Sequence, residues 1–214
     1  MPPDSPLDPK RRSRRKQARP AEIIEAALAL FAERGFAATK LEDVAARAGI
    51  GKGTIYLYFP TKEDLFRAVL RQGWLPNLEA AEAMVAAHAG PTAELLRQLA
   101  THALGMIESR FIAIPKLVLA ESGNFPALAR LYAEEVATRA MRLIGGVIAR
   151  GIERGEFRQM DVQSVIPLFG APFLMLALWK QSLGRHTDIQ LRPREVIEAH
   201  LDLLLRGLAA DERG

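Results

Sequence analysis

Hydrophobic positions recur with helical spacing along almost the whole chain, whereas the alternation of a strand is nearly absent. Residues 24–31 place apolar side chains at i, i+3, i+4 and i+7, and residues 41–48 repeat that pattern. Pro20 suits the first turn of the first helix, and Gly35 and Gly49 are expected to end the two helices. The spacing therefore predicts an all-α protein that opens with two short helices.

A third short helix is predicted over residues 52–59. The run Gly49–Gly51 forces an abrupt turn into it, and Pro60 ends it. Ile55 and Phe59 are four residues apart and share the inward face. The side chains left to point outward are Lys52, Thr54, Tyr56 and Tyr58. Two short helices joined by a glycine-containing turn are typical of the helix-turn-helix, whose second helix lies in the DNA major groove.

Two capping patterns set expected helix starts. Thr39, with Glu42 three residues later, forms a capping box at the second helix. Thr61, with Asp64 three residues later, caps a longer helix that follows the third. The first domain is therefore a compact set of short helices that leads into a longer one.

The composition mainly excludes several kinds of metal and catalytic site. With 214 residues, the chain is long enough for one or two domains, and 49% apolar residues are ordinary for a globular protein. It contains no cysteine, which excludes disulfides, thiolate metal sites and a cysteine nucleophile, and its four histidines lack ligand spacing. No Ser/His/Asp grouping or phosphate loop is recognisable. An enzyme on a helical scaffold, the main rival class, is therefore disfavoured, and neither a cofactor nor a metal is expected.

Basic charge is concentrated at the N-terminus. Residues 1–19 hold seven basic and two acidic side chains, a net charge of +5 where the whole chain carries +4. Such an arm is a common footprint of nucleic-acid binding. Its candidate DNA contacts are Arg14, Arg15, Lys16 and Arg19. A disordered, solubilising tail explains the charge equally well, and the segment lacks the apolar region of a secretory signal.

One segment tests a membrane alternative. Residues 162–179 contain no charged side chain and reach the lower length limit of a spanning helix. Pro167 and Pro172 interrupt them, and no second segment of this kind exists. A buried helix of a soluble protein is therefore favoured, and such an apolar helix must be covered by something.

The run TKLEDVAARAGIGKGTIYLYFPTKEDLF, residues 39–66, strongly resembles the DNA-binding domain of the TetR/AcrR family of bacterial transcriptional regulators. The match extends back to about residue 20. The resemblance implies a basic, disordered arm (1–19), a three-helix DNA-binding domain (20–66) and a larger helical regulatory and dimerisation domain (67–214), with about nine helices in total. It implies a cytoplasmic, homodimeric repressor that a small molecule releases from a palindromic operator. A helical interaction module without DNA would leave the hydroxyls and lysines of residues 52–62 idle.

The resemblance also implies particular DNA contacts. They are Thr39, Lys40, Lys52, Gly53, Thr54, Tyr56, Tyr58 and Lys62. Thr39 would hold a phosphate as well as cap its helix, and Lys62 would point at the DNA backbone. Lys52 could bond guanine O6 or N7. Glu42 stands where relatives often read a base, although an N3 capping role is favoured, and Leu57 either meets a thymine methyl or lies at the rim.

The larger domain is predicted to contain six or so helices, and the family's sensor role requires a cavity there. Candidate lining residues, each of which could equally be ordinary core, are Met106, Arg110, Phe111, Phe125, Phe173 and Trp179. These surroundings favour an apolar or aromatic small molecule. The resemblance further implies that residues 161–183 and 192–208 meet their twins across a two-fold axis. The expected interface side chains are Phe173, Leu176, Ile197, Leu201, Leu204 and Leu208.

Overall fold

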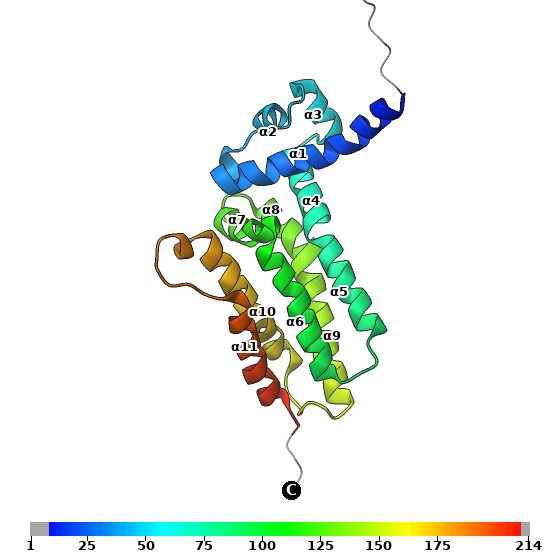
Figure 1. Cartoon of the computed structure of the whole chain (residues 1–214), viewed down its shortest axis with the longest axis vertical. Coiled ribbons are helices and arrows are strands. Elements are labelled where there is room, and N and C mark those ends of the chain that lie inside the picture. Colours follow the sequence, from blue (N-terminus) through cyan, green and yellow to red (C-terminus); the bar gives the residue numbers. More distant parts are fainter. Residues whose placement is uncertain (1–8, 211–214) are drawn as a thin grey trace, which may run out of the picture. The chain divides into compact units, whose positions relative to one another are not determined.

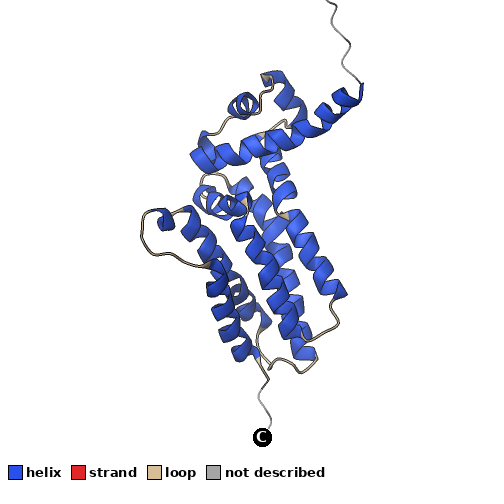
Figure 2. Cartoon of the chain, viewed as in Figure 1, coloured by secondary structure: helices blue, strands red, loops and turns tan. Residues whose placement is uncertain are grey.

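The computed structural model describes residues 9–210, with side chains from Pro20 onward, and contains no β-strand within that range (Figure 1; Figure 2). The chain divides into two compact units, the first ending at Val69 and the second beginning at Leu70. The all-α prediction is confirmed. The boundary lies three residues beyond the one expected from the sequence.

The first unit contains the helix-turn-helix. Its elements are α1 (Pro9–Ala38), α2 (Leu41–Arg47), α3 (Lys52–Tyr58) and the start of α4 (Lys62–Gly73). The tight turn between α2 and α3 depends on Gly49, whose φ of 65° is a left-handed conformation that glycine adopts without strain. The predicted motif is confirmed.

An aromatic cluster forms the centre of the first unit. The rings of Phe31 and Phe36 from α1 lie 6.2 and 6.0 Å from that of Phe66 in α4, both in edge-to-face geometry. All three side chains are buried. Ile55 of α3 is fully buried and Phe59 nearly so, as their spacing predicts. Burial of these side chains holds the short helices together.

The beginning of α1 differs from the prediction. The helix starts at Pro9, so Pro20 lies inside it, and residues 9–19 of the expected disordered arm are helical. The reason lies in the composition of that segment, since arginine, lysine, glutamine and alanine are strong helix formers. Residues 1–8, and the side chains of the four arm residues named above, lie outside the described part. Gly35 breaks the helical geometry as expected (φ 81°, ψ 170°), although one more turn follows it.

The second unit is a bundle of longer helices. Its elements are α5 (Leu75–Ala87), α6 (Thr92–Glu108), η1 (Arg110–Ile112), α7 (Ala113–Glu121), α8 (Pro126–Tyr132), the π-helix η2 (Ala133–Ala137), α9 (Thr138–Glu153), α10 (Val162–Gln181), η3 (Leu183–Arg185) and α11 (Pro193–Leu208). The elements α8, η2 and α9 follow one another without a break. Counted as one helix, they bring the number of α-helical stretches described after α4 to six, as predicted.

Helix α6 lies at the centre of this bundle. It packs against α5, α9, α10 and α11 (Figure 1). Its side chains Leu95, Leu96 and Ala100 are fully buried.

The chain makes a close contact with itself just after α9. The ring of Phe157 lies against the backbone at Gly151. A β-carbon at Gly151 would come within 2.2 Å of that ring, which is itself buried.

This contact predicts opposite effects for two glycines of α9. Gly151→Ala forces the buried Phe157 ring to move and should lower the free energy of unfolding by about 1–3 kcal/mol. Gly146 is exposed and has open space around it, so Gly146→Ala should raise stability by about 0.5–1 kcal/mol. Chemical denaturation followed by circular dichroism measures both. Equal effects of the two changes would contradict the close approach.

Candidate functional site

Helix α3 presents polar groups outward on a very short element. Ile55 is its only buried side chain, while Lys52 and Tyr56 are exposed and Thr54 and Tyr58 are half-buried. No atom lies within 4 Å of the position that a β-carbon on Gly53 would occupy, so this face of the helix is open to a partner. Leu57 is 84% exposed.

Glu42 of α2 gathers two of the outward groups of α3. The ammonium of Lys52 lies 3.0 Å from Glu42 Oε1, and the hydroxyl of Tyr56 donates to the same oxygen at 2.9 Å. The hydrogen bond from Lys52, with smaller contributions from the backbone amide and Tyr56, lowers the pKa of Glu42 to about 2. The carboxylate thus bridges α2 to α3. The favoured N3 capping role is wrong, because the N-cap of α2 is Lys40, which places Glu42 at N2.

Thr39 also differs from its prediction. Its hydroxyl donates to the carbonyl of Gly35 at 2.7 Å, and its amide donates to the carbonyl of Phe36 at 3.3 Å. The side chain is only 1% exposed, and the N-cap of α2 is Lys40, without a side-chain capping bond. The capping box is therefore absent. Phosphate oxygens only accept hydrogen bonds, so Thr39 has no proton to offer one in this conformation.

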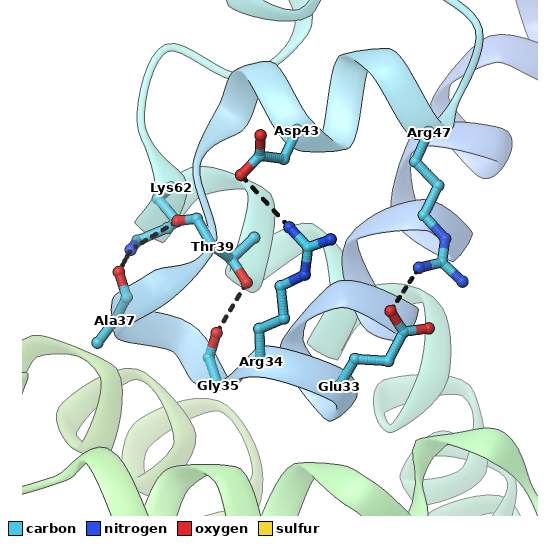
Figure 3. Close-up of polar contacts among 8 residues, drawn as sticks. All are labelled: Glu33, Arg34, Gly35, Ala37, Thr39, Asp43, Arg47 and Lys62. Atoms are coloured by element: carbon cyan, nitrogen blue, oxygen red, sulfur yellow. Dashed lines mark hydrogen bonds and ion pairs between the residues drawn. The ribbon is translucent and has the colours of Figure 1, made fainter.

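Ion pairs tie α2 to the end of α1 (Figure 3). Arg47 donates to Glu33 at 2.7 Å, and the pKa of Glu33 is lowered chiefly by this hydrogen bond. Arg34 lies 3.9 Å from Asp43. All four side chains are 41–55% exposed, so each pair adds little stability.

Lys62, at the start of α4, points inward rather than toward the surface. Its ammonium lies 3.2 Å from the carbonyl of Ala37 and 3.0 Å from that of Thr39 (Figure 3). It also lies 2.5 Å from the carbonyl of Phe36. An ammonium has three protons, and these carbonyls can take all of them. The ammonium also lies 4.3 Å from the centroid of the Phe36 ring. The structure thus uses Lys62 to cap the C-terminal end of α1, against the expectation of a DNA contact.

A cavity of about 560 Å³ lies inside the second unit. Helices α5, α6, α7, α9 and α10 and the segment around η2 contribute to its walls. The walls are mainly aliphatic and aromatic, and none of the described residues that line the cavity is charged. Its volume is within the range of small-molecule sites, and its apolar walls match the expected class of ligand.

The sequence located the cavity only in part. Of the six candidates, Met106 and Phe173 line it. The other four candidates are not among its lining residues. Arg110 and Phe111 belong to η1, Phe125 directly precedes α8, and Trp179 lies in the last turn of α10. Several lining residues that sequence reasoning missed, such as Tyr132 and Ala140, are on the α8–α9 stretch. Its periodicity alone does not distinguish a cavity wall from packed core.

The expected interface side chains of α10 and α11 are mostly core. Leu176, Ile197, Leu201 and Leu208 are at most 7% exposed within the single chain, and Leu204 and Phe173 are half-buried. The apolar stripe of α11, expected to form the dimer interface, is buried against the protein's own helices instead. The exposed apolar side chains of these two helices are Leu168, Leu174, Met175 and Leu203.

Helix α10 is only partly covered. It is long and apolar enough to cross a membrane by length and composition alone, and 22% of its apolar window is buried inside the protein. The sequence predicted that this helix would be covered, and the single chain covers it only in part. Leu168 and Met175 are seven residues apart and therefore lie on one face, which remains uncovered in the single chain.

The inward position of Lys62 leads to a stability test. Lys62→Met keeps the apolar stem but removes the ammonium that these carbonyls share, so the free energy of unfolding should fall by about 1–3 kcal/mol. The matched change Lys40→Met, at an exposed lysine, should alter stability by less than about 0.5 kcal/mol. Chemical denaturation measures both. A fully stable Lys62→Met variant with weaker, less salt-dependent DNA binding would restore the phosphate role.

Comparison with known proteins supports the helix-turn-helix assignment. Residues 23–69 match the family described as bacterial regulatory proteins, tetR family, and residues 94–206 match that described as AefR-like transcriptional repressor, C-terminal domain. The HTH-type transcriptional repressor KstR2 of Rhodococcus jostii (strain RHA1) is 29% identical over 91% of this chain and 93% of its own. The fatty acid metabolism regulator protein of Bacillus subtilis (strain 168) is 26% identical over 69% of this chain and 77% of its own.

A solved structure extends the likeness to both units. The ketosteroid transcriptional regulator KstR2 of Mycobacterium tuberculosis matches with a TM-score of 0.69 at 27% identity, over 90% of this chain and 96% of its own. The match to the repressor C-terminal domain alone covers more than half of the chain. The chain therefore belongs to the tetR family of bacterial regulatory proteins.

Proposed function

We propose that this protein is a cytoplasmic transcriptional repressor that binds a palindromic operator as a homodimer and leaves it when a small apolar molecule enters the cavity. The observation that carries the proposal is the open, donor-rich face of α3 within a helix-turn-helix. The two relatives are named as a transcriptional repressor and a metabolic regulator, which supports a regulator over an enzyme.

The DNA contacts are proposed from the exposed groups alone. Lys52, Thr54, Tyr56 and Tyr58 offer the donors of α3, and Gly53 lets the helix approach closely. Lys40 is exposed at the start of α2, where it could reach a phosphate. The basic residues of the arm, Arg14, Arg15, Lys16 and Arg19, remain proposed contacts.

Homodimerisation is proposed to cover the exposed face of α10 and α11. Leu168 is 53% and Leu203 72% exposed, and large exposed apolar side chains on adjoining helices are typical of an interface. Helices α10 and α11 pack against each other, so one twin chain could cover both. These exposed side chains replace the interface residues expected from the sequence, most of which are buried within the single chain.

Release by an effector requires a link between the two units. Helix α4 is continuous from Lys62 to Gly73, so it crosses the boundary after Val69 without a break. An effector that favours the conformation unable to bind DNA would weaken operator binding, typically by about 5- to 150-fold, and the operator would weaken effector binding by the same factor. The relatives' names refer to ketosteroids and to fatty acid metabolism, and both classes of molecule have a large apolar part, which fits the apolar cavity.

The DNA flanking the protein's own gene tests the proposal directly. A gel shift should show saturable binding to a palindromic site there, with half-sites separated by about 10 base pairs or a multiple. Competition with unrelated DNA separates specific from general binding. Binding that unrelated DNA abolishes at equal concentration would rule out the operator.

Two variants of α3 should fail in different ways on that operator. Lys52→Ala should cost about 1–3 kcal/mol and relax one base position, because lysine can reach a guanine edge. Tyr58→Phe should weaken binding to every sequence about equally, because a phosphate carries no sequence information. Fluorescence anisotropy against a set of single-base variants of the operator measures both. Unchanged specificity in Lys52→Ala would show that this side chain does not read a base.

The corrected dimer interface predicts a second pair of outcomes. Leu203→Glu should shift the sedimentation coefficient toward that of a monomer and abolish specific operator binding, while circular dichroism stays helical, since Leu203 is already exposed in the single chain. Leu201→Glu should instead unfold the second unit, since it places a carboxylate in the core, at a cost of several kcal/mol. A dimeric, operator-binding Leu203→Glu protein would remove this face from the interface.

A further inference from the structure

Three polar side chains interrupt the apolar wall of the cavity. They are Asn77 of α5, His102 of α6 and Tyr132 at the end of α8. Every other lining group is aliphatic, aromatic or a glycine, and no lysine, arginine, aspartate or glutamate occurs among the described lining residues. Isolated polar groups on an apolar wall are what fix the orientation of a small ligand.

The hydroxyl of Tyr132 is the most conspicuous of the three. It makes no hydrogen bond with any described residue, and burial raises its pKa to about 12. The hydroxyl therefore stays protonated and able to donate. The side chain is only half-buried by exposure because it faces the cavity. A hydroxyl on a cavity wall that has no protein partner can bond to water or to a ligand.

Neighbouring contacts hold Tyr132 in this position. Its ring packs edge-on against Trp74, with the ring centroids 6.0 Å apart at an angle of 81°. The indole N–H of Trp74 already donates to the carbonyl of Phe111 at 3.3 Å, so it does not bind the tyrosine oxygen. The ring is fixed while its hydroxyl remains available.

His102 and Asn77 line the same cavity. Asn77 comes one helical turn after Trp74, and His102 Nε2 lies 2.8 Å from the backbone carbonyl of Asn77. A carbonyl only accepts hydrogen bonds, so Nε2 carries the proton and Nδ1 is an acceptor in the neutral ring. The side-chain amide of Asn77 has no partner among the described residues and offers both a donor and an acceptor.

A local irregularity of the helix accompanies this cluster. The π-helix η2 begins directly after Tyr132, and its residues Val136 and Ala137 also line the cavity. A π-helical turn inserts an extra residue into the helix, which changes the direction of the flanking side chains, and such turns are frequent at functional sites. The irregular turn and the unpartnered hydroxyl therefore lie at the same place on the cavity wall.

We propose that the cavity selects an uncharged, largely apolar molecule that carries one hydroxyl or carbonyl oxygen, held by Tyr132 together with His102 and Asn77. An ionised ligand group would be buried without a counter-charge, which disfavours acids and amines at this position. This assignment rests on the proposed role of the cavity as the effector site.

Matched probes test the assignment on the full-length protein without DNA. Isothermal titration calorimetry compares 2-naphthol, 2-methylnaphthalene and 2-naphthoate, together with the larger pair 9-phenanthrol and 9-methylphenanthrene. Each methyl compound has nearly the shape of its hydroxyl partner, so their difference isolates the hydrogen bond. Within at least one pair, the hydroxyl compound should bind about three- to tenfold more tightly, and the carboxylate should bind more weakly than both two-ring neutral probes.

Variants connect that preference to Tyr132. Tyr132→Phe should abolish the difference between hydroxyl and methyl probes while leaving the affinity for the methyl probe unchanged. Its melting temperature should be unchanged or slightly raised, because the lost hydroxyl has no protein partner. Thr101→Ala removes a hydroxyl that donates to the backbone carbonyl of Arg97 outside the cavity, and it should keep the wild-type preference.

Each result bears on one of the two proposals. Equal binding of hydroxyl and methyl probes by the wild-type protein, a preference that survives in Tyr132→Phe, tighter binding of the carboxylate, or no binding of any probe would each overturn the proposed polar anchor. Probes that bind with the expected preference but do not release operator DNA would leave the anchor standing. That outcome would count against the effector-controlled repressor instead.

Discussion

The recognition surface depends on the burial of one short helix. Helix α3 has seven residues, and isolated helices shorter than about 12–15 residues are marginal in water. Its stability therefore comes from the packing of Ile55, which is fully buried, against the rest of the first unit. Because only one side of so short a helix can be buried, its other side is left to polar groups and to the exposed Leu57.

Polar contacts then decide how these helices are oriented. Glu42 joins α2 to α3, the pairs Glu33–Arg47 and Arg34–Asp43 join α1 to α2, and Lys62 joins α4 to the end of α1. Exposed ion pairs each contribute about 0–1 kcal/mol, so their role is to set geometry more than stability. A DNA phosphate that reaches Lys52 or Tyr56 must compete with Glu42, whose low pKa keeps it charged at neutral pH.

Local patterns in the sequence predicted the elements well and the use of their polar side chains poorly. The turn at Gly49, the inward pair Ile55 and Phe59, and the helical stretch from Pro126 are all visible as spacing, and the structure contains them. The hydrogen bond between Tyr56 and Glu42 spans 14 residues and that between Lys62 and Phe36 spans 26, so no periodicity reveals them. For these side chains, the sequence could only predict the contact that is typical of the family, and the structure shows a different one.

The same limit applies to the second unit. The apolar stripe of α11 correctly predicted a buried face, but a stripe does not say whether its own chain or a twin covers it. Leu203, one of the most exposed apolar side chains, lay outside that stripe. The cavity was equally invisible, because its wall and the packed core use mostly the same residue types, and only Asn77, His102 and Tyr132 break the pattern among the described lining residues.

Because the cavity is uncharged, binding of DNA and binding of an effector should respond differently to salt concentration. DNA binding through lysine and arginine releases counterions and weakens steeply as salt concentration rises. A neutral molecule in a cavity without charged walls releases none, so its occupancy is nearly independent of ionic strength. Osmotic stress that changes the salt content of a cell would therefore act on operator binding directly, and on effector binding only through the coupling between the two sites. One chain can in this way respond both to salt and to its effector.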